Sequence, residues 1–222
     1  MQLYRGAADA VPIVLGYLPI GFAFGALGVA TGLSILQAVA MSAFVFAGSA
    51  QFIALSMFGT GAAPAAVVTG TFFINLRHLL MSTALSRKVM ATSRPLLGLL
   101  AFGITDETFA VAAGRRGQHH PLYMLGLEGT AYLAWVASTA AGAATGARFT
   151  AGWGLEFALP AMFIALLVAQ MVEWRRAVVA VLAALMSLLG QGLIPGNWDV
   201  LLVASLAAAV GVVLERGQRD VA

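Results

Sequence analysis

Two carboxylic acids, Asp106 and Glu107, are adjacent in the middle of an apolar segment, residues 95–113. A charged side chain at that depth in an apolar helix lacks water to solvate it. A carboxyl group in a low-dielectric setting holds its proton more tightly, so it can load and release a proton near neutral pH. These residues are therefore the strongest candidates for a titratable function. The alternative is a charge pair that only stabilises the protein.

The stretch INLRHLL places an arginine and a histidine within a second apolar segment, residues 62–86. Arg77 is costly in lipid unless it reaches the interface or meets an acid, and we expect Asp106 or Glu107 to be its partner. His78 is suited either to hydrogen-bonded packing or to proton handling. One helix face collects four polar residues at helical spacing, and Arg77 points away from that face. These four residues are Thr71, Asn75, His78 and Ser82.

The two preceding apolar segments hold small and polar residues that suit either packing or ligand binding. Gly21 and Gly25 begin a glycine stripe at helical spacing, close after Pro19. Small residues let helices approach closely in lipid, whereas a helix interrupted there would free backbone amides for a substrate carboxylate. Ser49 and Gln51 are open to the same two interpretations.

The elements that position these residues must be membrane helices. The chain has 222 residues, of which 61% are hydrophobic and 9% charged, with a mean hydropathy of +0.93. Soluble domains carry about 25% charged residues, so this chain cannot cover a water-facing surface. A lipid-exposed segment without strand alternation must be helical to satisfy its backbone. Windows of spanning length are 10–31, 34–58, 62–86, 95–113, 121–143, 156–173, 176–194 and 199–214.

We therefore predict an all-α integral membrane protein, a single polytopic domain over residues 1–222 with seven or eight transmembrane helices. Broken or re-entrant elements are expected near residues 12–25, 47–51 and 103–109. If window 95–113 re-enters without crossing and the N-terminus is outside, more Lys and Arg residues fall on the cytoplasmic side than if all eight windows cross. The positive-inside rule therefore favours seven crossings and one re-entrant element.

Several classes of function are disfavoured by the residues that are missing. There is no cysteine, no H-E-x-x-H zinc motif and no P-loop, and Ser49 lies in A-G-S-A rather than in a nucleophile turn. We expect no catalytic residues, no metal site and no cofactor. The net charge of +3 is typical of basic cytoplasmic loops, so no nucleic-acid partner is expected.

Four sequence blocks, in this order and spacing, resemble the AzlC-type large subunit of branched-chain amino acid exporters. They are PIGFAFGA (19–26), FAGSAQF (46–52), NLRHLLMS (75–82) and TDETF (105–109). The resemblance covers about residues 5–130. Met81 stands where the family often has an aromatic residue, and it lies off the polar face.

This resemblance implies a multi-pass exporter of leucine, isoleucine or valine in the cytoplasmic (inner) membrane of a prokaryote. It also implies a small AzlD-type membrane partner of about a hundred residues; a homo-oligomer is equally compatible with the sequence. We expect proton-coupled secondary transport, with a site drawn from the residues singled out above. The alternatives are a non-transporting scaffold subunit and a channel. The predicted site residues are Gly21, Gly25, Ser49, Gln51, Asn75, Arg77, His78, Asp106 and Glu107.

Overall fold

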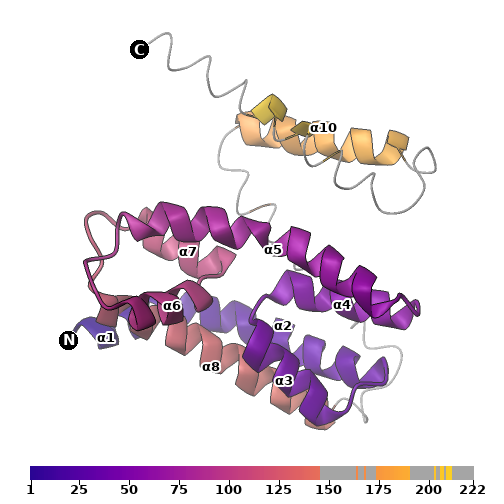
Figure 1. The fold of residues 1–222 in the computed structure, drawn as a ribbon, viewed down its shortest axis with the longest axis horizontal. Coiled ribbons are helices and arrows are strands. Elements are labelled where there is room, and N and C mark those ends of the chain that lie inside the picture. Colours follow the sequence, from indigo (N-terminus) through magenta and orange to yellow (C-terminus); the bar gives the residue numbers. More distant parts are fainter. Residues whose placement is uncertain are drawn as a thin grey trace. The chain divides into compact units, whose positions relative to one another are not determined.

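The computed structural model describes residues 1–145 and 174–190, with a few isolated residues between 164 and 211. The chain divides into two compact units, Met1–Leu159 and Pro160–Ala222. Within the described residues the regular elements are all helices (Figure 1), as predicted. The first unit contains α1 (Gln2–Asp9), α2 (Val11–Ala30), α3 (Ile35–Val45), α4 (Gly48–Gly59), α5 (Pro64–Ser86), α6 (Arg94–Phe102), α7 (Asp106–Gly114) and α8 (Pro121–Thr145); the second contains α10 (Trp174–Gly190).

Among the described residues, two helices are long and apolar enough to cross a membrane, namely α2 and α5. The bent pair of α6 and α7 makes a third if the two are counted as one span. The predicted window 34–58 is divided between the shorter helices α3 and α4. Windows 156–173 and 199–214 lie almost entirely outside the described residues, so seven or eight crossings remain a prediction.

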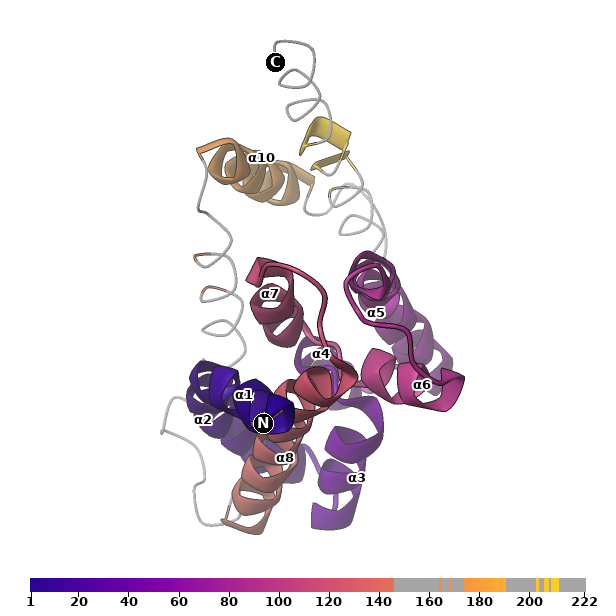
Figure 2. The same cartoon turned by 90° about the vertical axis from the view of Figure 1, so that its left-hand side faces the viewer.

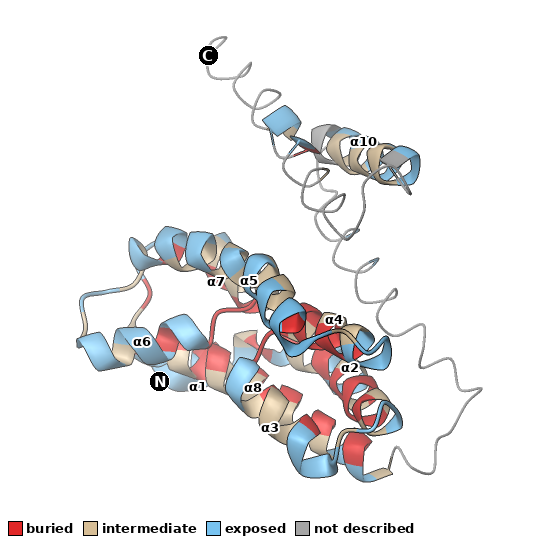
Figure 3. Cartoon of the chain, turned by 45° about the vertical axis from the view of Figure 1, so that its right-hand side comes forward, coloured by how far each residue is buried: buried red, intermediate tan, exposed pale blue. Residues whose placement is uncertain are grey.

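Helix α8 is the central packing element of the first unit, because α1, α2 and α3 all lie against it (Figure 2). Glycines allow these contacts to be very close. A Cβ atom on Gly25 would lie 2.1 Å from the Thr139 carbonyl oxygen, and one on Gly142 would lie 1.9 Å from the Phe22 carbonyl oxygen. No larger residue fits at either position without moving backbone. Buried residues concentrate on α2, α4 and α8, whereas α5 is mostly exposed (Figure 3).

The predicted interruption near residues 12–25 is wrong, because α2 runs unbroken from Val11 to Ala30 with Pro19 inside it. Pro19 lies on the exposed side of the helix. It therefore removes one backbone donor without disturbing the face that packs on α8. Gly21 and Gly25 belong to that packed face, so the glycine stripe serves close helix contact.

The break expected near residues 47–51 occurs at Phe46 and Ala47, between α3 and α4. Phe46 has φ 41° and ψ 48°, a left-handed conformation that is rare for a bulky residue. Its ring is nevertheless buried, with its centroid 5.1 Å from that of Tyr132 and 6.2 Å from that of Phe102. Aromatic packing thus holds the chain in a conformation that ends one helix and starts the next.

A second break, expected near residues 103–109, separates α6 from α7 at residues 103–105, where the helix direction bends by 115°. Thr105 caps α7: its hydroxyl accepts from the Thr108 amide, and its own amide donates to the Thr108 hydroxyl. This reciprocal capping satisfies backbone groups that the break leaves without helical partners. The four consecutive polar residues that begin at Thr105 therefore start a new helix.

The loops on either side of the α6–α7 pair are hydrogen-bonded to each other. The His119 amide donates to the Lys88 carbonyl at 2.6 Å, and the Met90 amide donates to the His119 carbonyl at 3.0 Å. Burial lowers the pKa of His119, and its ring Nε2 lies 2.9 Å from the Ala112 carbonyl. A neutral ring with its proton on Nε2 suits this contact. Because the two loops touch, the chain enters and leaves the α6–α7 pair at neighbouring points, an arrangement compatible with the predicted re-entrant element.

Candidate functional site

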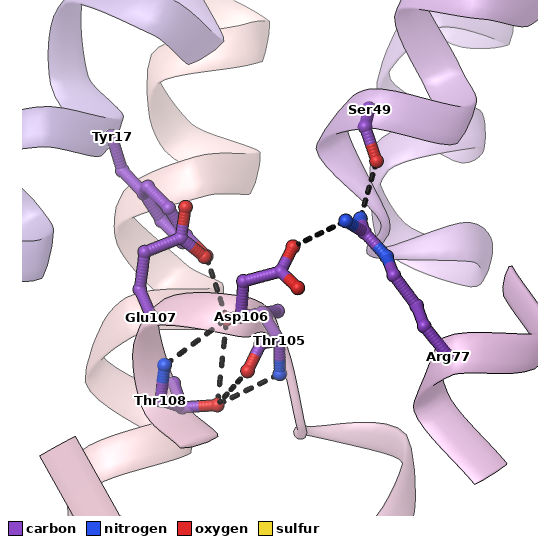
Figure 4. Close-up of polar contacts among 7 residues, drawn as sticks. All are labelled: Tyr17, Ser49, Arg77, Thr105, Asp106, Glu107 and Thr108. Carbon is purple, nitrogen blue, oxygen red and sulfur yellow. Dashed lines mark hydrogen bonds and ion pairs between the residues drawn. The ribbon is translucent and has the colours of Figure 1, made fainter. Parts of the chain in front are cut away.

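An ion pair between Arg77 of α5 and Asp106 of α7 is the centre of the candidate site (Figure 4). The guanidinium Nη1 lies 2.8 Å from the Asp106 Oδ2. The other terminal nitrogen, Nη2, donates a hydrogen bond to the Ser49 hydroxyl on α4. The expectation that Arg77 pairs with one of the two central acids is confirmed, and Asp106 is that acid.

Both partners of Arg77 lie in the first turn of a half-helix, directly after a break between two helices. Ser49 is the second residue of α4, and Asp106 is the first residue of α7. Helix N-termini carry partial positive charge and free amide groups, so they favour anions. Around Arg77, the N-termini of α4 and α7 and the guanidinium group all favour negative charge, and Asp106 is the carboxylate bound there. This excess of positive charge makes the site suitable for a second anion.

The ion pair is only partly enclosed. The side chains of Arg77 and Asp106 keep 34% and 23% of their surface exposed. One nitrogen of the pair itself, Arg77 Nε, is buried and has no hydrogen-bond partner among the described residues. Buried polar groups are rarely left unsatisfied in proteins. The site thus combines access with unused hydrogen-bonding capacity.

Glu107 points to a different neighbour, Tyr17 of α2 (Figure 4). The Tyr17 hydroxyl donates to Glu107 Oε2 at 2.7 Å and lies 2.8 Å from the Thr105 hydroxyl. A phenol has one proton, so Thr105 can donate to the Tyr17 oxygen while Tyr17 donates to the carboxylate. The α6–α7 break is thereby tied to α2 through Tyr17.

Gln51 belongs to a separate, fully buried network that stabilises the α3–α4 break. Its Oε1 accepts from the Ala47 amide at 3.3 Å and from the Trp135 indole at 3.1 Å. Its Nε2 donates to the Ser42 hydroxyl at 2.9 Å, and Ser42 is paired with Thr139 of α8. A buried network with all its members paired rigidifies a packed region. The structure thus gives Gln51 a contact with α8 rather than with Arg77.

Four of the nine predicted site residues come together around the α6–α7 break: Ser49, Arg77, Asp106 and Glu107. Asn75 and His78 are half-buried on α5, and Gly21 and Gly25 are covered by α8. The sequence reasoning missed Tyr17 and Thr105, which join the site from α2 and from the break itself. The one signal for Tyr17 was a hydroxyl group in an otherwise apolar helix.

The sequence also has an acid, Glu128, inside the apolar window 121–143, seven residues after Pro121 and thus at a position compatible with the membrane interface. The structure instead buries it, with 3% of its surface exposed, against the α6–α7 break. The signal in the sequence was an acid inside an apolar window. Spacing alone did not reveal that the break packs on it.

Comparison with known proteins gives a consistent set of relatives. Inner membrane protein YgaZ of Escherichia coli strain K12 is 31% identical over 176 residues, which cover 75% of this chain and 72% of that protein. An uncharacterized membrane protein of Archaeoglobus fulgidus is 32% identical over 167 residues, covering 73% of each chain. The branched-chain amino acid transport protein AzlC of Bacillus subtilis strain 168 is 28% identical over 207 residues, covering 91% of this chain and 80% of that one.

Solved structures add nothing to this comparison, because none is significantly similar to the chain. The family model described as AzlC protein matches residues 12–149, a range that includes both helix breaks and every residue around Arg77. Together with the apolar helices α2 and α5, the relatives identify a membrane protein. The match to the family model and the identity to these relatives show that the chain belongs to the AzlC family.

Proposed function

We propose that this chain is the large subunit of a proton-coupled secondary transporter that exports branched-chain amino acids across a prokaryotic cytoplasmic membrane. The observation that carries the proposal is the partly exposed Arg77–Asp106 pair, held between the first turns of two broken helices. Broken helices whose half-helix ends face a substrate are a recurrent feature of secondary transporters. The relative from Bacillus subtilis, named as a branched-chain amino acid transport protein, supports the class of substrate.

In this proposal the zwitterionic substrate separates the charges of the ion pair. Its carboxylate binds Arg77 and the amide groups at the start of α4, because a guanidinium fork matches a carboxylate. Its ammonium group binds the released Asp106 carboxylate or Glu107. The pair therefore provides one opposite charge for each charged group of the amino acid. These contacts replace the water that solvates the two groups in solution.

An aliphatic side chain requires an apolar wall, and aromatic rings from both breaks are at hand. The ring centroids of Phe46 and Phe102 lie 6.2 Å apart, and Tyr132 lies 5.1 Å from Phe46 and 6.0 Å from Phe102. Phe46 and Phe102 adjoin the α3–α4 and α6–α7 breaks, and Tyr132 of α8 contacts both rings. The cluster favours leucine, isoleucine or valine over polar amino acids, because burying apolar surface is favourable.

A small AzlD-type membrane subunit is part of the proposal. It rests on the family resemblance, and the exposed apolar face of α5 is compatible with a partner or with lipid. A reconstitution experiment should therefore include this subunit. The same comparison, with and without it, separates a transporter from a scaffold that does not transport.

Counterflow of radiolabelled leucine in proteoliposomes tests the proposal. Arg77→Gln should weaken apparent leucine affinity by about tenfold or more, since a hydrogen bond to a charged group contributes about 1.5–3 kcal/mol. Arg77→Lys should lie between this variant and the wild type, because lysine keeps the charge but not the fork. Arg87→Gln, at the exposed end of the same helix, is the matched control.

Two outcomes would contradict different parts of the proposal. Counterflow by Arg77→Gln equal to that of the wild type would remove Arg77 from the substrate site. A wild-type protein that is folded and joined to its partner, yet shows no saturable exchange of leucine, isoleucine or valine, would favour the scaffold alternative.

A further inference from the structure

Glu128 is an acid with no role in the site described above, and the α6–α7 break covers it. It is 3% exposed, on the face of α8 that meets the break. A Cβ atom on Gly103 would lie 2.7 Å from Glu128 Oε2 and 2.7 Å from its Cβ. The side chain of Glu128 thus occupies the space that a Cβ atom at position 103 would need, and glycine fits there without a clash.

Within the described residues, this carboxyl group forms no ion pair with a cation and accepts no hydrogen bond. Its Oε1 is buried and has no partner there. Titratable groups on α8 and on the helices packed against it do not form an ion pair or hydrogen bond with Glu128; α3 carries none. These groups are Tyr4, Arg5 and Asp9 on α1, Tyr17 on α2, Arg94 on α6, Asp106 and Glu107 on α7, and Tyr123 and Tyr132 on α8.

Several of these groups have other partners. Tyr17 is bonded to Glu107, and Asp106 is paired with Arg77. Asp9 is bonded to both Arg115 and Tyr123. Glu128 thus differs from Asp106, whose charge is balanced by a guanidinium at 2.8 Å.

A buried carboxylate with no partner costs several kcal/mol, whereas the neutral carboxylic acid does not carry that penalty. The conformation in this structure is therefore suited to a Glu128 that carries a proton. Ionisation requires a change in its surroundings, such as water reaching it or a cation approaching. The α6–α7 break, which covers Glu128, is the element able to provide that change.

The same break carries the other half of the proposed transport site. Thr105, at its end, contacts Tyr17, and the next residue, Asp106, is the partner of Arg77. A substrate that displaces Asp106 from Arg77 must therefore act on the segment that covers Glu128. This connection is short and contiguous, as coupling between two sites requires.

We propose that Glu128 is the residue that carries the coupling proton, an inference that rests on the transport function proposed above. In the state open to the outside, the carboxylate takes up one proton from external water. In the state open to the cytoplasm, it releases that proton to internal water, and the amino acid moves in the opposite direction. One proton and one O–H bond account for the step, and no further reactant is needed.

Proteoliposomes containing the full chain and its small membrane partner allow coupling and substrate movement to be measured separately. Glu128→Gln imitates the protonated acid and cannot release a proton. We expect it to keep leucine exchange at equal pH on both sides and to lose leucine movement driven by a pH gradient. Asp9→Asn makes the same carboxyl-to-amide change outside the site, and it should keep both activities.

Each other result has a defined meaning. Gradient-driven transport by Glu128→Gln equal to that of Asp9→Asn would overturn the inference. Loss of exchange as well, with Asp9→Asn intact, would also overturn it, because Glu128 would then serve substrate binding or structure. A wild-type protein that exchanges leucine without any response to the pH gradient would refute proton coupling and leave substrate transport standing.

A second measurement uses the wild-type protein and so does not depend on a variant that folds. Hydrophobic carbodiimides react with protonated carboxyl groups in apolar surroundings, and peptide mass spectrometry locates the adduct. We expect the label on Glu128 in preference to Asp106 and Glu107, with less labelling as pH rises. A label on Asp106 or Glu107 that leaves Glu128 unmodified would overturn the assignment.

Discussion

At the scale of single residues, the division of two adjacent acids between two partners is the central feature of this protein. Asp106 and Glu107 are neighbours in the first turn of α7, so their side chains leave the helix about 100° apart. One can face Arg77 on α5, while the other faces Tyr17 on α2. Two consecutive acids thus connect the start of α7 to two separate helices, α5 and α2.

Tyr17→Phe tests the second of these connections. The variant keeps the ring contacts with Phe46 and Trp135 but leaves Glu107 without the donor it has in this structure. We expect the free energy of unfolding to fall by about 1–3 kcal/mol, the usual cost of such a loss. Leucine exchange should fall as well, because the break loses its tie to α2.

Thermal unfolding of the purified protein and the exchange assay provide these two measurements. Tyr4→Phe is the matched control, because Tyr4 is 77% exposed. Equal stability and equal exchange in the two variants would show that the Tyr17 hydroxyl does not hold the break.

At the scale of helices, the close contact between α2 and α8 provides the rigid part against which the broken helices are placed. Gly21 and Gly25 face Ser138 and Thr139, and Gly142 faces Phe22. The backbones of α2 and α8 are so close at these glycines that a Cβ atom there would clash with the other helix. The network around Gln51 then attaches the α3–α4 break to the same helix.

Two glycines in α2 should respond in opposite directions to the same substitution. Gly25→Ala places a Cβ atom 2.1 Å from the Thr139 carbonyl oxygen, so it should destabilise the protein by about 1–3 kcal/mol or more. Gly16→Ala meets nothing within 4 Å, and it should be neutral or stabilise by up to about 1 kcal/mol through helix propensity. Thermal unfolding measures both changes, and equal destabilisation would contradict the observed contact.

At the scale of the whole molecule, whether α6 and α7 cross the membrane or re-enter decides which side of the membrane the later loops occupy, and the prediction is that they re-enter. The natural chain has no cysteine, so single cysteines can be introduced without prior replacements. Ser93→Cys and Gln118→Cys lie just before α6 and in the loop after α7, and both positions are exposed. A membrane-impermeant maleimide should label both from the same side.

Ala63→Cys provides the reference for the opposite side, because the candidate span α5 lies between it and Ser93. It should be labelled only from the other face of the membrane. If Ser93→Cys and Gln118→Cys were labelled from opposite faces, α6 and α7 would form a crossing, and the re-entrant prediction would be refuted.

Local sequence patterns were sufficient for the class of protein, for the break at the polar run after Gly103 and for the need of Arg77 for an acid. These properties depend on composition and on neighbouring residues, since a charge in an apolar helix requires a counter-ion whatever the fold. The four blocks of family resemblance likewise are local, and the family that they indicate is confirmed by the family comparison.

Packing between distant segments decided the rest. Proline and glycine predicted a broken α2, but contact with α8, more than a hundred residues later, accompanies an unbroken helix. Arg77 pairs with Asp106 rather than with Glu107 because of the rotation of α7 about its own axis, which directs Asp106 towards α5. The burial of Glu128 depends on a break that passes over it from another part of the chain. Such contacts join residues far apart in sequence, and no local periodicity encodes them.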